Sequence, residues 1–84
     1  MPVIIDLRDD LQKYLRAHGL WKKWLKAKKL FEQNPSHNSL HTELLEPSSR
    51  HIYSFRIDRQ YRAIFICLPD DSIEIISVTN HYRK

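Results

Sequence analysis

The sequence predicts an α+β fold in which an N-terminal helical hairpin packs on one face of a small antiparallel sheet. Apolar residues recur at helical spacing in the first half of the chain, and the apolar period changes to two after residue 51. The connections between the strand-like runs are short, which requires antiparallel neighbours. With 84 residues, the chain is expected to form one domain, residues 1–84.

The first half predicts two helices joined by a short turn. Asp6 can cap a helix that begins at Leu7, and Gly19 can end it. A second helix is expected over residues 20–33, because Pro35 disfavours helical geometry in the residue before it. We interpret both tryptophans as core residues, since they lie in the apolar stripe of this helix: Leu20, Trp21, Trp24, Leu25, Ala27 and Phe31.

The second half predicts a three-strand meander. The strands are expected at residues 52–57, 62–68 and 73–78, which are rich in β-branched and aromatic residues. Turns at 58–60 and 69–72 connect them. The polar segment before residue 51 is expected to be a loop.

Three smaller features limit the chemistry. The β-branched run Val3–Ile5 can add a short edge strand to the meander. Cys67 is the single cysteine, which excludes an internal disulfide and a Cys-rich zinc site, and we interpret it as a small core residue. Gly19 is the single glycine, which excludes glycine-rich phosphate loops. The histidines show no metal-ligand spacing, so neither a metal nor a cofactor is expected.

Basic charge is concentrated in the two predicted helices. Residues 8–31 contain eight Lys/Arg and two Asp, a net charge of +6, whereas the whole chain carries +4. This excess suggests a polyanionic partner such as nucleic acid, or it is simply a solvated helix face. No apolar run approaches the ~20 residues that span a bilayer. The N-terminus has no signal-peptide pattern, so a cytoplasmic location is expected.

The second half also offers groups for acid–base chemistry. Cleavage of RNA through the ribose 2′-hydroxyl needs a base, an acid and cations that stabilise a charged phosphorane-like transition state. A carboxylate, two guanidiniums, an imidazole and a phenol are available: Glu43, Arg56, Arg62, His81 and Tyr82. Alternatively, the two arginines form surface ion pairs with carboxylates, for which the candidates are Glu43, Glu46 and Asp58.

The turn between the first two strands decides whether the arginines can act together. A three-residue loop at 58–60 places Arg56 and Arg62 on one face of the sheet, whereas a two-residue loop places them on opposite faces. We predict the three-residue loop. His81 is then expected to converge with both arginines, and Glu43 to reach in from the preceding loop.

Four stretches carry a resemblance to a known family: Glu43-Leu44-Leu45, Tyr53-Ser54-Phe55-Arg56-Ile57, Gln60-Tyr61-Arg62-Ala63-Ile64-Phe65 and Ser77-Val78-Thr79-Asn80-His81-Tyr82. Together they resemble the RelE/ParE superfamily of type II toxin–antitoxin toxins. The nearest branch is the YoeB-like mRNA interferases, and the resemblance covers about residues 40–82. Arg83-Lys84 extend beyond the tyrosine that usually ends a YoeB-like chain.

The resemblance implies a role for each residue. Glu43 corresponds to the general base and His81 to the general acid. Arg62 corresponds to the arginine that stabilises the transition state, and Arg56 to a second phosphate-binding arginine. Tyr82 corresponds to the tyrosine that positions the substrate. His41 lies near a position where relatives often carry a basic residue.

The resemblance also implies partners. Such toxins cut mRNA in the ribosomal A site, bind ribosomal RNA through basic helices, and are neutralised by a cognate antitoxin. The corresponding helix lysines here are Lys22, Lys23, Lys26 and Lys29. A homodimer and a toxin–antitoxin hetero-oligomer are both open. The alternatives are a non-nucleolytic ParE-like gyrase poison, a catalytically silent antitoxin-binding domain, or a small RNA-binding protein.

Overall fold

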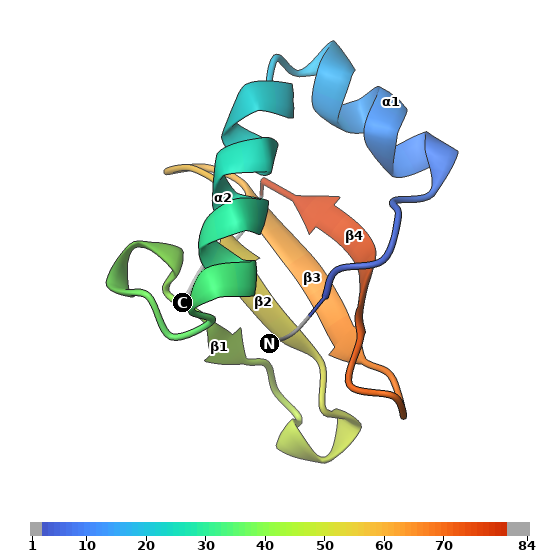
Figure 1. Cartoon of the computed structure of the whole chain (residues 1–84), viewed down its shortest axis with the longest axis vertical. Helices are drawn as coiled ribbons and strands as arrows, with labels where there is room; N and C mark the ends of the chain where they lie inside the picture. Colours follow the sequence, from blue (N-terminus) through green and yellow to red (C-terminus); the bar gives the residue numbers. More distant parts are fainter. Residues whose placement is uncertain (1–2, 81–84) are drawn as a thin grey trace.

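Residues 3–80 are described by the computed structural model of this chain, which contains two helices and a four-stranded sheet (Figure 1). The sheet is antiparallel, with strand order β1-β2-β3-β4. The expected α+β architecture is therefore confirmed. The elements are α1 (Asp9–Ala17), α2 (Trp21–Gln33), β1 (Glu43–Leu44), β2 (Tyr53–Arg56), β3 (Arg62–Cys67) and β4 (Ile73–Thr79), with single 3-10 turns η1 (Asn38–Leu40) and η2 (Ser48–Arg50).

The two helices form the predicted hairpin over one face of the sheet (Figure 1). Gly19 separates them with a backbone φ of +65°, a left-handed conformation that glycine adopts at little cost. The second helix ends at Gln33, directly before Asn34-Pro35, as predicted. Figure 1 shows α2 lying across the sheet, with α1 at an angle to it and above β4 in this view.

The start of α1 differs from the prediction. Asp6 does not cap the helix, which begins at Asp9 with Arg8 at its N-cap and no side-chain cap. The reason is that the preceding chain is held extended: Ile4 forms a parallel bridge with Ile73 at the start of β4. The expected N-terminal edge strand is thus a single bridge beside β4.

Phe55 of β2 is the centre of the core. Its side chain is completely buried and stacks on Phe31 with ring centroids 4.8 Å apart. Trp24 and Phe65 also contact it, at 6.1 and 5.7 Å between centroids. The interpretation of Trp24 as a core residue is confirmed, whereas Trp21 is half-buried, with the Arg16 guanidinium 4.2 Å above its ring.

Two residues expected in the core are exposed instead. Leu25 is 46% exposed and lines a hollow beside Trp21 and Trp24. Cys67 is also exposed, since it occupies the last position of β3, where the strand runs beyond the cover of α2. Leu25 was expected in the core from the helical spacing of the apolar stripe, and Cys67 from its position inside an apolar run.

A β-bulge changes the direction of the side chains along β4. Phe65 pairs with Ile75, but the preceding residue of β3, Ile64, pairs with Ser77, so Ile76 is an extra residue. A bulge of this kind shifts the alternation of side chains by one position. As a result, Ile75 faces the core while Ser77 faces away from it.

Candidate active site on the distal face of the sheet

The face of the sheet turned away from α2, here called the distal face, carries most of the predicted site. Phe55 and Phe65 contact α2, and neighbouring residues along a strand point to the opposite side. Directly paired residues share a face. The pairing therefore gives two rows on the distal face, Glu43–Ser54–Ile64–Ser77 and Arg56–Arg62–Thr79.

The pairing of β2 with β3 shows how many residues form the turn between them. Arg56 lies directly opposite Arg62, and the next pair is closed by a hydrogen bond of 2.9 Å from the Ile57 N–H to the Tyr61 carbonyl. Residues 58–60 therefore form the loop, and the three-residue loop is confirmed. Both guanidiniums belong to one face, as predicted.

Arg62 is deeply buried within this face, with 4% of its surface exposed. Its Nε donates a 2.9 Å hydrogen bond to the Ser54 hydroxyl, and its Nη2 contacts the Ser54 carbonyl at 3.3 Å. Nη2 also donates to the His41 carbonyl. Ser54 pairs with Glu43, and His41 precedes Glu43 by two residues in the sequence. These bonds therefore hold the Arg62 guanidinium beside Glu43, the expected base.

The His41 carbonyl is a part of the site that sequence reasoning did not find. His41 has a left-handed backbone, with φ of 45° and ψ of 51°, at the end of η1. Left-handed residues other than glycine are uncommon and carry strain. No side-chain pattern could have revealed this acceptor. Ser54 left a weak signal, because it is a small polar residue between two aromatic residues of a strand.

Glu43 was expected in a loop, but it lies in a strand. It is half-buried in the two-residue strand β1, paired with Ser54. Pairing with β2 fixes its side chain on the distal face more firmly than a loop would. The position of Glu43 relative to the arginines is thus set by backbone hydrogen bonding.

Arg56 is half-buried at the end of β2. Among residues 3–80, its guanidinium makes no ion pair or side-chain hydrogen bond. Asp58, one of the carboxylates considered for it, pairs with Lys23 instead, at 3.1 Å. Like charges directly opposite each other on a sheet repel, so the Arg56–Arg62 pair favours an anion on this face.

Asp58 fixes the loop that aligns the two arginines. Its Oδ1 accepts hydrogen bonds of 2.9 Å from the backbone N–H groups of Gln60 and Tyr61, while Lys23 binds Oδ2. Burial raises the pKa of the Asp58 carboxyl, but these three donors outweigh it and hold the pKa below its ordinary value of 3.8. The turn is therefore tied to α2 through an ionised carboxylate.

We expect Asp58→Asn to make folding less sensitive to acid. A carboxyl whose pKa is lower in the folded state stabilises the fold above its unfolded pKa, and this contribution is lost as pH falls through the folded pKa. Urea unfolding between pH 2 and 5 should show a shallower loss of stability in the variant. At pH 7 the variant should be about 1–2 kcal/mol less stable. Asp71→Asn is the control, and a variant curve parallel to that of the native chain would contradict the prediction.

His81 and Tyr82, the expected acid and substrate-positioning residue, lie outside the described residues. The last residue of β4, Thr79, pairs with Arg62. In the sequence, His81 follows Thr79 by two residues. Their expected roles stay predictions.

The four helix lysines divide into two groups. Lys23 and Lys26 line a groove between α2 and the end of β2. Lys22 and Lys29 are exposed on α2 and do not line that groove. The role of these four lysines in RNA binding stays a prediction.

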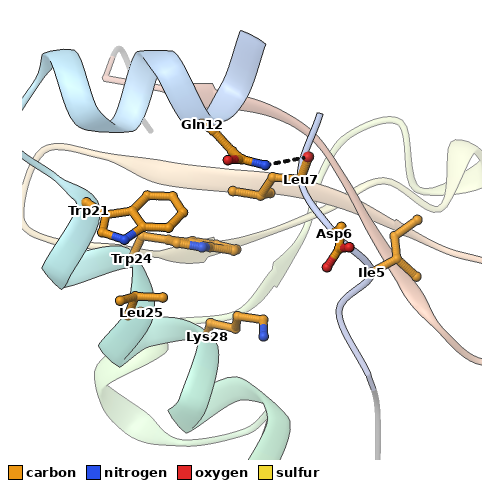
Figure 2. A pocket seen from close by; sticks show the side chains of 8 residues that line it. All are labelled: Ile5, Asp6, Leu7, Gln12, Trp21, Trp24, Leu25 and Lys28. Atoms are coloured by element: carbon orange, nitrogen blue, oxygen red, sulfur yellow. Dashed lines mark hydrogen bonds between the residues drawn. The ribbon is translucent and has the colours of Figure 1, made fainter. Parts of the chain in front are cut away.

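A separate hollow of about 360 Å³ lies on the helix side of the molecule (Figure 2). Figure 2 shows the rings of Trp21 and Trp24 on one side of it, and Gln12 donating a 3.0 Å hydrogen bond to the Leu7 carbonyl. The charged residues lining it are Asp6 and Lys28. No arginine or histidine is among its described lining residues, whereas the distal face carries Arg56 and Arg62. The hollow therefore lacks the groups that the proposed acid–base chemistry needs.

Within the part of the chain that the structure covers, no three His, Cys, Asp or Glu side chains are grouped closely enough to bind a metal ion. Over the same residues, neither helix has the length and apolarity needed to cross a bilayer.

Solved structures of two toxins share this architecture. The dimeric YoeB from Staphylococcus aureus matches with a TM-score of 0.68 and 23% sequence identity, over 95% of this chain and 94% of that one. A YoeB/ParE toxin from Agrobacterium tumefaciens gives a TM-score of 0.69 and 17% identity, over 98% of this chain and 100% of the other. The chain has the YoeB/ParE toxin fold.

A third structure with this fold is part of a larger assembly. The heterotetrameric YoeB–YefM toxin–antitoxin complex from Staphylococcus aureus contains a chain that matches with a TM-score of 0.65 and 22% identity, over 98% of this chain and 97% of that one. No family model matches the sequence, and no curated protein matches it either. The YoeB/ParE fold expected from the sequence resemblance is thus confirmed by structure.

Proposed function

We propose that this chain is the toxin of a type II toxin–antitoxin system and cleaves mRNA on the ribosome. The observation that carries the proposal is the strand register, which gathers Glu43, Arg56 and Arg62 on one face of the sheet. The YoeB/ParE fold and the basic helices support it. The sequence continues from the end of β4 into His81 and Tyr82, the remaining residues of the expected set.

The proposed reaction needs only side chains. Glu43 accepts the proton of a ribose 2′-hydroxyl, and the 2′-oxygen attacks the adjacent phosphorus. The bond from phosphorus to the 5′-oxygen breaks, and His81 donates a proton to that oxygen. Arg62 and Arg56 stabilise the extra negative charge on the phosphate oxygens. The products are a 2′,3′-cyclic phosphate and a 5′-hydroxyl, and the mechanism involves neither a metal nor a cofactor.

The proposed partners are the ribosome, its mRNA and a cognate antitoxin, which places the chain in the cytoplasm. YoeB from Staphylococcus aureus forms a complex with YefM in one solved structure and a dimer in another. By analogy, we propose that this chain binds an antitoxin in a hetero-oligomer and can also form a homodimer. Tyr82 would position the substrate near the scissile phosphate.

Glu43→Gln and His81→Ala should each reduce mRNA cleavage by about 10²-fold or more, because each removes one partner of proton transfer. Cleavage is measured by mapping mRNA ends in a translating extract, with Glu46→Gln as the matched control for Glu43. Equal cleavage by all chains would overturn the proposal. Gyrase inhibition by the native chain without mRNA cleavage would favour the ParE-like alternative instead.

A further inference from the structure

A groove of about 260 Å³ runs beside the proposed active site. Its lining residues come from α2, from η1 and from the end of β2 with the two residues that follow it. Among residues 3–80, β1 pairs with Tyr53 and Ser54 alone, so the rest of this edge of β2 has no partner strand there, and Arg56 at the end of β2 lines the groove. We call it the α2–β2 groove.

Arg56 belongs to both the groove and the distal face. The register pairs it with Arg62 on the distal face, and Arg56 is also one of the residues that line the groove. The groove and the arginine pair therefore meet at this residue. This shared residue connects two features that the sequence does not connect.

The charge of the groove favours an anion. Lys23, Lys26 and Arg56 line it together with a single carboxylate, Asp58. The Lys23–Asp58 ion pair neutralises one positive charge. Within residues 3–80, neither Lys26 nor Arg56 has an ion-pair partner. Two cationic side chains thus remain to bind ligand, one at the distal-face end and one on α2.

Apolar residues line the groove beside these charges. They are Ala27 and Leu30 of α2, Leu40 of η1 and Ile57 after β2. Cationic residues beside apolar ones suit a single-stranded nucleic acid, whose phosphates alternate with largely apolar sugars and bases. An acidic peptide would match the charges, but nothing links it to a site that binds a phosphodiester.

We propose that the α2–β2 groove binds the RNA strand next to the scissile phosphate, with Lys26 contacting a neighbouring phosphate. The inference rests on the proposed function, since it assumes that RNA occupies the distal face. It divides the helix lysines by role: Lys26 guides the substrate strand, whereas Lys29 lies outside its path.

The test uses amide NMR shifts of the full chain with 2′-O-methyl RNA, which cannot be cleaved through its 2′-oxygen. A dinucleotide should shift the signals of Ser54, Arg62 and Thr79. A hexanucleotide should shift Lys26 and Ile57 as well. If the hexanucleotide shifts only the distal-face signals, the groove proposal is wrong and the proposed function stands. If neither RNA shifts those signals, the proposed function fails, and the groove proposal fails with it.

A matched pair of variants tests Lys26 directly. Lys26→Gln should weaken hexanucleotide affinity about threefold and lower the slope of log affinity against log salt by about 0.7, as expected for one lost contact to a single strand. Lys13→Gln removes the same charge from the exposed surface of α1, outside the groove, and should change affinity less than about twofold. Equal effects of the two variants would overturn the proposal, as would stronger groove shifts with a hexaglutamate peptide than with the hexanucleotide.

Discussion

Arg62→Ala should slow mRNA cleavage by about 10²–10³-fold and also destabilise the fold. Loss of one preorganised donor to a transition-state oxygen costs about 10²–10³ in rate. The same change leaves the buried Ser54 hydroxyl and the His41 carbonyl without their donor, and we expect a loss of about 2–4 kcal/mol in the free energy of unfolding. The two effects are measured by mapping mRNA ends and by urea unfolding.

Arg62→Lys separates the two roles. Lysine keeps the positive charge but lacks the planar fork that reaches Ser54 and His41 together, so the variant should fold and still cleave about 10²-fold more slowly. Arg59→Ala, in the exposed turn, is the control and should change stability by less than about 0.5 kcal/mol. Full cleavage by Arg62→Ala would show that the distal face is not the active site.

Phe55→Ala should have the largest effect on folding alone. Phe55 is completely buried and its ring contacts Trp24, Phe31 and Phe65. Truncation of a buried phenylalanine costs about 3–5 kcal/mol. A domain of this size has little more than that to lose, so the variant should be largely unfolded at 37 °C by circular dichroism.

Leu44→Ala provides the comparison for Phe55. Leu44 lies in the neighbouring strand β1 and is 45% exposed, so its truncation should cost less than about 1 kcal/mol. A cooperative thermal transition of Phe55→Ala within a few degrees of the native one would show that the aromatic cluster does not hold the helices on the sheet.

The sequence was sufficient to predict the elements that follow from local periodicity. Helix α2 ends where Pro35 requires, and the turn at 58–60 has the predicted length. Exposed Cys67 shows where such reasoning stops, because the burial of a strand end depends on how far a helix from another part of the chain extends over it. Burial is a property of the packed layers.

The site was predicted in its residue types but not in its supporting contacts. Alternation along β2 and β3 was enough to place Arg56 and Arg62 on one face. The pairing of β1 with β2, by contrast, joins two residues of a polar segment to a strand ten positions away, and the segment carries no strand-like period. The His41 carbonyl depends on a backbone angle that no side chain specifies.

The bulge at Ile76 has a consequence for how the length of this chain can vary. The extra residue lies between Ile75, which faces the core, and Ser77, which faces away from it. The residues on either side of the bulge therefore alternate between the two faces in different phase. Loss of that residue would exchange the solvent side and the interior side for every position after it. Additional residues can therefore be accommodated in the turn at Pro69–Ser72, whereas the number of residues between Ile73 and Thr79 is constrained by both surfaces of the sheet at once.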